Sequence, residues 1–248
     1  MVNIGLRSAR PSRIFRPQMT DPTQELPDFS AIDVWVFDLD NTLYPASCRL
    51  FDQIDVKMGE FVSRSLGLSY ADAKLRQKAL FYKHGTTLRG LMQEHGLQPE
   101  GFLDYVHDID YSAITADATL AEAINKLRGR KLVFTAGTVA HATRAMDRLG
   151  ITHLFEDIFD IVHADYVPKP QAAPYDAFLK KHGVTATSAA MFEDIARNLE
   201  VPHALGMVTV LVTHDDNRDA KHLNEGADGE HVHYRTNDLG KFLTELQT

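Results

Sequence analysis

The sequence contains little that would place it outside the cell or in a membrane. Cys48 is the only cysteine among 248 residues, so no disulfide can form within the chain, which fits a reducing compartment. No run approaches the ~20 apolar residues that a membrane-spanning helix needs, and no short apolar signal segment follows Met1. We therefore expect a soluble cytoplasmic protein, with Cys48 as an ordinary core or loop residue.

An excess of positive charge is also missing. The formal net charge is −8, from 26 Lys and Arg against 34 Asp and Glu. Binding a nucleic-acid polymer or an anionic membrane needs clustered, excess Lys and Arg, so neither partner is expected. A small anionic ligand stays open, because one local cation can reverse the field around a site. The oligomeric state stays open as well.

Residues 1–30 differ from the rest of the chain. They carry four arginines at every third position and four prolines, and no acid occurs before Asp21: Arg7, Arg10, Arg13 and Arg16; Pro11, Pro17, Pro22 and Pro27. Proline interrupts helices, so we predict a disordered N-terminal arm over residues 1–30. An organelle transit peptide is the open alternative.

Residues 50–116 read as helical. Apolar residues three to four apart form one stripe from Phe51 to Leu66 and stop at Gly67, which is the period of an amphipathic helix. Residues 71–82 and 88–95 continue this pattern, and Gly96 stands where a glycine ends a helix. We predict a helical cap over residues 49–116.

From residue 120 onward, helix-like and strand-like segments alternate. Apolar runs at residues 131–137, 158–164, 189–194 and 207–216 are separated by helical patterns at 120–129, 139–150, 174–183 and 195–206, and residues 238–247 form a last amphipathic pattern. Such alternation predicts an α/β fold with a parallel sheet covered on both faces. With the strand at residues 34–37, residues 31–48 and 117–248 would form this core, and the cap would be an insertion after the first strand.

Polar residues follow the apolar runs. Asp38 and Asp40 follow residues 34–37, Thr135 follows the second run, Lys169 lies after the third, and Glu193 and Asp194 close the fourth. Ligands in parallel sheets bind beyond the carboxyl ends of the strands, so we expect these residues to meet. Each alone has an ordinary structural interpretation as a helix cap, a surface loop or an acidic first turn.

The chemistry of this set favours a metal and a phosphate. Close carboxylates repel unless a cation lies between them, and Mg²⁺ accepts carboxylate, carbonyl and phosphate oxygens. Asp38, Asp194 and the carbonyl of Asp40 are the predicted ligands. Lys169 lies between two prolines that stiffen its backbone. The Thr135 hydroxyl and the backbone N–H groups of the turn at Ala136 and Gly137 are of the kind that hold phosphate oxygens.

The ordered motifs DLDNT (38–42), FTAG (134–137), PKP (168–170) and FED (192–194) resemble the haloacid dehalogenase-like hydrolase superfamily. The resemblance implies a Rossmann-like core with a mobile cap. It also implies Asp38 as the nucleophile that forms an aspartyl-phosphate, Asp40 as acid and base, Thr135 and Lys169 as phosphate-holding groups, and Asp194 as a Mg²⁺ ligand. Whether Glu193 assists the metal is left open.

Two details refine the resemblance. Dehalogenases of the superfamily lack the second aspartate, so Asp40 favours phosphoryl chemistry. Family members often carry Asn where this chain has Ala136, which leaves the rate or the leaving-group preference in doubt. The segments at residues 34–45, 82–96, 105–112, 166–171 and 191–199 look like the pyrimidine 5'-nucleotidase-type branch. That branch implies a nucleoside 5'-monophosphate such as UMP or CMP as the small phosphorylated substrate.

Cap residues would select the substrate. The candidates are Lys83, Thr86, Thr87 and Arg89, although a threonine here can equally cap the helix that begins at residue 88. Open alternatives for the function are a phosphosugar or phosphoglycolate phosphatase, a phosphomutase with the same two aspartates, and a non-catalytic phospholigand-binding regulatory protein. His231 and His233 have no third metal ligand nearby, and we interpret them as part of a solvated late strand.

Overall fold

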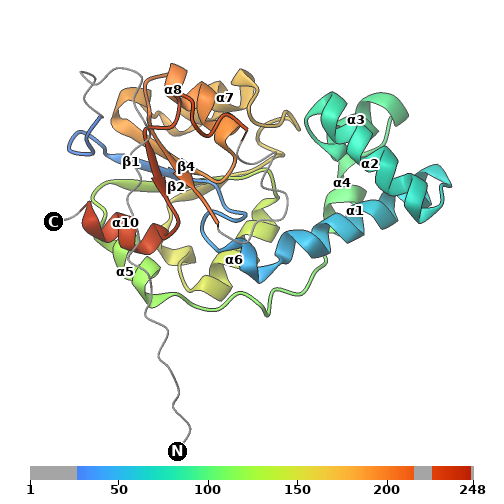
Figure 1. Cartoon of the computed structure of the whole chain (residues 1–248), viewed down its shortest axis with the longest axis horizontal. Helices are drawn as coiled ribbons and strands as arrows, with labels where there is room; N and C mark the ends of the chain where they lie inside the picture. The colour runs from blue at the N-terminus through green and yellow to red at the C-terminus, as the bar shows by residue number, and fades with distance from the viewer. Residues whose placement is uncertain (1–26, 215–224, 247–248) are drawn as a thin grey trace, which may run out of the picture.

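The computed structural model describes residues 27–214 and 225–246. A six-stranded sheet forms the middle of the α/β core (Figure 1). Its strand order is β3-β2-β1-β4-β5-β6, and every neighbouring pair is parallel. The strands are β1 (Val34–Phe37), β2 (Arg130–Phe134), β3 (Asp157–Phe159), β4 (Ala189–Glu193), β5 (Val208–Val212) and β6 (Tyr234–Thr236). The predicted α/β fold with a parallel sheet is confirmed.

Strand β1 shows why these runs form strands. All four of its residues are buried. Val34 and Val36 face one hydrophobic cluster, whereas Trp35 and Phe37 face another on the opposite side of the sheet. A parallel strand covered on both faces has no solvent-facing positions, so it reads as a continuous apolar run.

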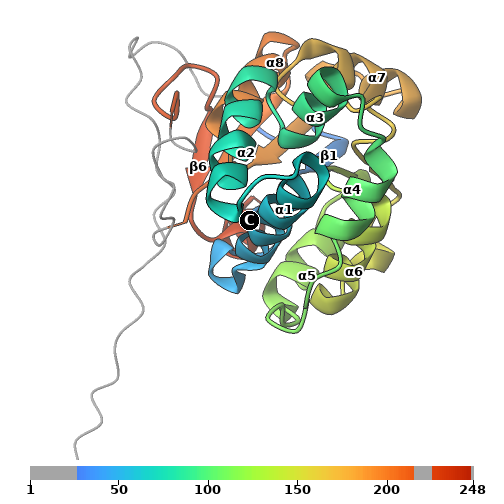
Figure 2. The ribbon, with the colours of Figure 1, turned by 90° about the vertical axis from the view of Figure 1, so that its right-hand side faces the viewer.

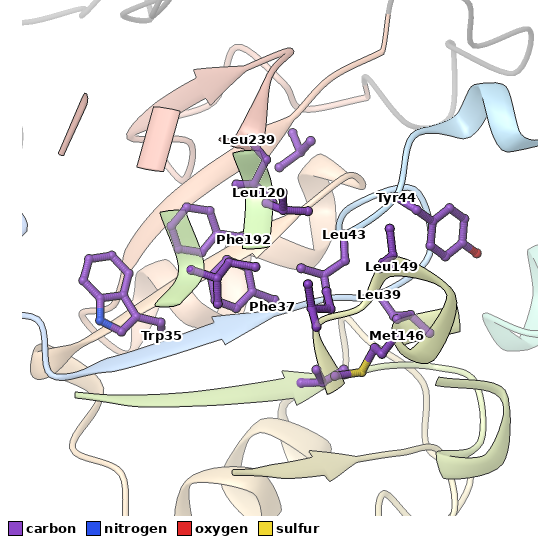
Figure 3. Packing of buried hydrophobic residues seen from close by; sticks show 14 of the residues in the cluster. Trp35, Phe37, Leu39, Leu43, Tyr44, Leu120, Met146, Leu149, Phe192 and Leu239 are labelled. Carbon is purple, nitrogen blue, oxygen red and sulfur yellow. The ribbon is translucent and has the colours of Figure 1, made fainter. Parts of the chain in front are cut away.

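Helices cover both faces of the sheet. The helices α5 (Ala118–Lys126), α6 (Val139–Leu149) and α10 (Leu239–Glu245) pack residues such as Met146 against the face of Trp35 and Phe37 (Figure 3). On the other face, α7 (Ala172–His182) and α8 (Glu200–Ala204) contribute residues such as Phe178. Short 3-10 turns complete the core: η1 (Ala46–Cys48), η2 (Thr152–Leu154), η3 (Ala186–Ser188) and η4 (Ala196–Leu199).

Four helices follow β1 and stand to one side of the sheet (Figures 1 and 2). They are α1 (Leu50–Leu66), α2 (Tyr70–His84), α3 (Thr87–His95) and α4 (Pro99–Val106). They share a hydrophobic cluster that includes Ile54, Leu80 and Phe102, and Gly96 ends α3 with a φ of 62°. We refer to α1–α4 as the helical cap; its exact role and boundaries stay predictions.

The segment predicted as one helix over residues 195–206 is instead η4 followed by the five-residue α8. Pro202 has no N–H group, so the carbonyl of Asn198, four residues earlier, lacks its helical donor. The hydroxyl of Tyr175 donates to that carbonyl at 2.7 Å instead. The hydrophobic pattern was read correctly, but the proline shortened the helix.

The end of the predicted N-terminal arm is packed against the sheet. Residues 1–26 lie outside the described part, so the prediction of disorder there stays a prediction. The ring of Phe29 stacks on Trp35 with centroids 5.9 Å apart. Nearby, Gly129 has a φ of 88°, and a Cβ there would lie 2.1 Å from the carbonyl oxygen of Asp33, so only glycine fits this approach. Among the described helices, none combines the length and apolar character needed to cross a bilayer.

Candidate active site

The register of β1 with its neighbours brings three segments to one edge of the sheet. Phe37 pairs with Val133 of β2 and with Phe192 of β4, and the N–H of Asp38 donates to the carbonyl of Phe192 at 2.9 Å. Asp38 therefore follows β1 at the level where β2 and β4 also end. The strand order changes direction between β1 and β4, and such a switch point is where ligands bind in open α/β sheets.

Lys169 lies at this edge, although it does not directly follow a strand. Strand β3 ends at Phe159, and the loop of residues 160–171 carries the lysine back toward the centre of the sheet. Its ammonium donates to Asp38 Oδ1 at 2.8 Å, to Glu193 Oε1 at 2.7 Å and to the carbonyl of Phe134 at 3.1 Å. The prediction that Lys169 lies close to Asp38 is confirmed. The expectation that it lies at the end of a strand is wrong, because a loop carries it there.

Burial controls the charges of this group. The side chains of Lys169, Asp38 and Glu193 are 4%, 8% and 1% exposed. Burial disfavours the ammonium, but the two carboxylates outweigh it and raise the pKa of Lys169. Burial raises the pKa of Asp38 to about 7, against the opposing effect of Lys169. One cation therefore only partly compensates the carboxylates around it.

Glu193 has a full set of hydrogen bonds. Its Oε1 accepts from Lys169 and from Asn198 Nδ2 at 2.7 Å, and its Oε2 accepts from the N–H of Ile195 at 2.8 Å. A carboxylate held by three donors on both oxygens is fixed in position. Glu193 thus orients Lys169 and anchors the start of η4.

Asp38, Glu193 and Asp194 form a buried acidic cluster. One carboxylate oxygen of each lies within 4.8 Å of the others. Burial, together with Glu193 and Asp38, raises the pKa of Asp194 well above its usual value, and the amide of Asn41 donates to Asp194 Oδ2 at 3.4 Å. The oxygens of Glu193 are already engaged with hydrogen-bond donors. Asp38 and Asp194, buried with too little positive charge beside them, fit a small divalent cation such as Mg²⁺.

The Asp40 carboxylate has a different set of partners. Its Oδ1 accepts from the hydroxyl of Tyr44 and lies 2.8 Å from His141 Nε2. Burial alone would raise the pKa of Asp40, but His141 and Tyr44 lower it to about 2. The two aspartates of the DxD motif therefore have separate surroundings, one with the lysine and the acidic cluster, the other with a tyrosine and a histidine.

The sequence interpretation missed Tyr44 and His141. Tyr44 stands four residues after Asp40, and His141 lies in the first turn of α6, six residues after Thr135. The chain has twelve histidines. Of these, His231 and His233, predicted to lie in a late strand, precede β6 instead. The position of His141 four residues after the FTAG turn, in the first turn of the helix that follows, was the available signal.

The turn after β2 is built around Thr135. Its Oγ1 accepts from the N–H of Gly137 at 2.9 Å, and the side chain is buried. Ala136 is exposed at the edge of the sheet. Thr138 caps α6 by accepting from the N–H of His141 at 3.2 Å. The structure thus places Thr135, Ala136 and Gly137 at the edge that holds Asp38; their contacts with phosphate stay predictions.

The cap residues have structural partners. Thr86 Oγ1 caps α3 by accepting from the N–H of Arg89 at 3.1 Å, and Thr87 is buried with its hydroxyl 3.5 Å from the carbonyl of Gln77. Arg89 Nη1 lies 3.5 Å from the carbonyl of Tyr166 in the core, and Lys83 pairs with Glu94. Arg89 is therefore at the boundary between cap and core, while Thr87 points into the cap. Substrate contact by Thr86, Thr87 and Arg89 stays a prediction.

Comparisons with known proteins agree with the fold. The family model of a haloacid dehalogenase-like hydrolase matches residues 32–206. Phosphate metabolism protein 8 of Saccharomyces cerevisiae is 25% identical over an alignment of 213 residues that covers 79% of this chain and 64% of the yeast protein. The chain thus spans less than two thirds of that relative's length.

Solved structures share the architecture at low identity. A HAD phosphatase from Thermococcus onnurineus has a TM-score of 0.57 at 16% identity, covering 87% of this chain and 98% of that one. YfnB from Bacillus subtilis, bound to magnesium, has a TM-score of 0.53 at 14% identity, covering 88% of this chain and 99% of that one. L-2-haloacid dehalogenase from Xanthobacter autotrophicus has a TM-score of 0.52 at 15% identity, covering 87% of this chain and 98% of that one. These likenesses show the fold, and they include a phosphatase and a dehalogenase.

Proposed function

The chain belongs to the haloacid dehalogenase-like hydrolases, and from that premise we propose that it is a Mg²⁺-dependent phosphatase acting through an aspartyl-phosphate. The observation that carries the proposal is the pair of aspartates with separate surroundings. Asp38 belongs to the acidic cluster and accepts a hydrogen bond from Lys169, so a metal cation and a phosphate anion can meet beside it. Asp40, two residues later, is held apart by Tyr44 and His141 and is available for proton transfer.

In the first step, a carboxylate oxygen of Asp38 attacks phosphorus, and the bond from phosphorus to the leaving oxygen breaks. Asp40 gives its proton to that leaving oxygen, so an alcohol departs. In the second step, Asp40 takes a proton from water as the water oxygen attacks phosphorus. The bond between phosphorus and Asp38 then breaks, and inorganic phosphate leaves. A covalent carboxylate intermediate divides one difficult displacement into two easier ones.

The surroundings of Asp40 in the structure suit its role as base in the second step, and a bound substrate would change them for the first step. Without substrate, His141 and Tyr44 hold its pKa at about 2, which is the ionised form that accepts a proton from water. A phosphoryl group bound beside it brings a like charge, which raises the pKa of the carboxyl and favours the protonated form that the first step needs. One group can therefore act first as acid and then as base.

Asp38, Asp194 and the carbonyl of Asp40 would hold Mg²⁺, and Glu193 would keep Lys169 beside them. When bound, Mg²⁺ would neutralise charge between these carboxylates and the phosphoryl oxygens. The Lys169 ammonium and the hydroxyl of Thr135 would hold the remaining phosphoryl oxygens. Phosphoryl transfer depends mainly on such positioning and charge neutralisation.

We propose a pyrimidine nucleoside 5'-monophosphate as the substrate. The support is the resemblance of residues 34–45, 82–96, 105–112, 166–171 and 191–199 to the pyrimidine 5'-nucleotidase-type branch. A relative whose name refers to phosphate metabolism supports phosphate chemistry in general. Of the candidate cap residues, Arg89 is proposed to contact the substrate, because its guanidinium reaches the core at the carbonyl of Tyr166.

The test is phosphate release from UMP, CMP, AMP, sugar phosphates and phosphoglycolate, with Mg²⁺ or with EDTA, for the wild type and Asp38→Asn. We expect metal-dependent release that Asp38→Asn abolishes, with UMP or CMP as the best substrates. A preference for phosphoglycolate or sugar phosphates would refute the nucleotide assignment only. Absence of release from every ester by a folded, Mg²⁺-loaded protein would refute the phosphatase, and would favour a mutase or a binding protein.

A further inference from the structure

A line of hydrogen bonds runs from Asp40 into the interior of the protein. Asp40 Oδ1 lies 2.8 Å from His141 Nε2 and also accepts from the Tyr44 hydroxyl. On the other side of the imidazole, Nδ1 lies 2.9 Å from the hydroxyl of Tyr111, which donates to the carbonyl of His107 at 3.1 Å. The Asp40 side chain is 21% exposed, whereas that of His141 is fully buried. The line thus connects a partly exposed carboxylate to the buried residues His141, Tyr111 and His107.

The imidazole of His141 is confined by its neighbours. The ring of His107 stacks on it with centroids 4.5 Å apart and planes 17° from parallel. Gly137 leaves the space that the ring fills, because a Cβ at that position would lie 2.7 Å from His141 Cδ2. Both ring nitrogens have partners. A side chain confined by packing and by two hydrogen bonds can hold its neighbour within a narrow range of positions.

The partners of Asp40 come from both chain segments that join the cap to the sheet. Tyr44 lies between β1 and α1, and Tyr111 lies between α4 and α5. His141 itself belongs to α6, which follows β2. The carboxylate of Asp40 is therefore fixed, directly or through His141, by the two connections on which the cap is mounted.

An ordinary structural role for this histidine is the alternative. A buried histidine with two satisfied nitrogens can serve only to fill the core. Here, however, both described hydrogen bonds to the Asp40 carboxylate end on the same oxygen, Oδ1. A carboxyl group held by one oxygen presents its other oxygen in a defined direction. For a group that must deliver a proton to one atom, this direction determines the rate.

We propose that His141 is a positioning residue for Asp40, held in turn by Tyr111, and that it aims Oδ2 of Asp40 at the leaving oxygen and at the attacking water. This inference rests on the proposed function, in which Asp40 is the acid and base. His141 and Tyr44 keep their own hydrogens throughout. The proton leaves Asp40 Oδ2 for the leaving oxygen in the first step and returns to it from water in the second.

A series of aryl phosphates tests the proposal. Phenyl phosphate has a leaving oxygen that needs a proton, whereas 2,4-dinitrophenyl phosphate loses a stable anion without one. For His141→Ala we expect kcat/KM to fall about 100-fold on phenyl phosphate and to stay within about 3-fold of wild type on 2,4-dinitrophenyl phosphate. His141→Gln, which keeps an N–H group able to reach Asp40, should recover part of the loss. An equal loss on both esters, or no loss, would overturn the proposal.

A second readout concerns the hydrolytic step. With 2,4-dinitrophenyl phosphate, formation of the aspartyl-phosphate needs no acid, but its hydrolysis still needs Asp40 as base. His141→Ala should therefore release a burst of about one dinitrophenolate per active site, followed by slow turnover, so that kcat falls while kcat/KM does not. Steady release without a burst, at an unchanged kcat, would count against the role in the second step.

Matched variants separate positioning from folding. Tyr111→Phe removes one hydroxyl from the line and should show the same leaving-group dependence with a smaller loss, which keeps the test valid if His141→Ala fails to fold. Tyr105→Phe removes a cap hydroxyl bonded to Glu60, and His153→Gln changes an exposed histidine; both should behave as wild type. A wild type inactive on every ester would refute the proposed function and this inference together, whereas an active wild type with variants insensitive to the leaving group would refute this inference alone.

Discussion

Replacing Lys169 by methionine should destabilise the protein strongly, because it leaves buried carboxylates without their cation. The ammonium lies 2.8 Å from Asp38 and 2.7 Å from Glu193, in surroundings almost without solvent. At an effective dielectric constant of ~20, each contact corresponds to a gross attraction of roughly 6 kcal/mol. Desolvation of the ions offsets much of it, and removing one partner of a buried pair costs about 3–5 kcal/mol.

The lower end of that range is expected at pH 7. Burial already raises the pKa of Asp38 to about 7 with the lysine present, so without the lysine this carboxyl takes up a proton and part of the repulsion disappears. We expect a loss of about 3 kcal/mol in the free energy of unfolding, or a fall of about 6–12 °C in Tm for a chain of this size.

Urea unfolding in EDTA measures this loss. Trp35 is the only tryptophan and is buried in the core, so its fluorescence reports global unfolding. The matched control is Lys126→Met, which removes an exposed lysine paired with Glu122 on α5 and should leave the midpoint unchanged. A loss below about 1 kcal/mol for Lys169→Met, or one equal to that of the control, would refute the argument that the buried ammonium stabilises this fold.

Three further predictions concern the site and the cap. Mg²⁺ should raise the Tm of the wild type, because it binds the folded state preferentially. Asp194→Asn should remove that rise, whereas Asp104→Asn, which changes an exposed residue, should retain it. An equal rise in both variants would argue against Asp194 as a ligand. Gly137→Ala should lower kcat about 10-fold or more with the fold retained, because its Cβ would displace the ring of His141; Gly101→Ala, which meets no atom within 4 Å, should have no effect, and a fully active Gly137→Ala would contradict the argument. Arg89→Ala should raise KM for the best substrate with little change in kcat, and a change confined to kcat would exclude a role in ground-state binding.

Residues that lie close to Asp38 could be predicted from the sequence when they directly follow a strand. Asp38, Thr135 and Asp194 follow strands that read as apolar runs, and the parallel arrangement determines where those runs end. Lys169 was also placed correctly at this edge. Its route was not, because Lys169 stands ten positions after Phe159, the end of β3, and the path of such a loop depends on tertiary contacts.

Periodicity gave no indication of the partners of Asp40, and the place of His141 shortly after the FTAG turn was a signal for its nearness alone. His141 reads as one more buried position of an amphipathic helix, and Tyr111 lies in a connection without regular structure. Their meeting depends on how α6 packs beside the segment after α4, which no local pattern encodes. Glu193 is similar: the sequence shows an acid beside Asp194, and only the contacts with Lys169, Asn198 and Ile195 reveal that it holds other groups in place.

The pairing of β1 also has a consequence for how the chain is made. Val34 pairs with Arg130 of β2 on one side and with Ala189 of β4 on the other. The whole helical cap is synthesised after β1 and before β2. During translation, the most apolar strand of the sheet therefore emerges first and obtains its second native neighbour only after β4 has left the ribosome. A strand with unpaired edges is prone to associate with other chains. The yield of folded protein should therefore depend on how well residues 34–37 are protected while the rest of the chain is synthesised.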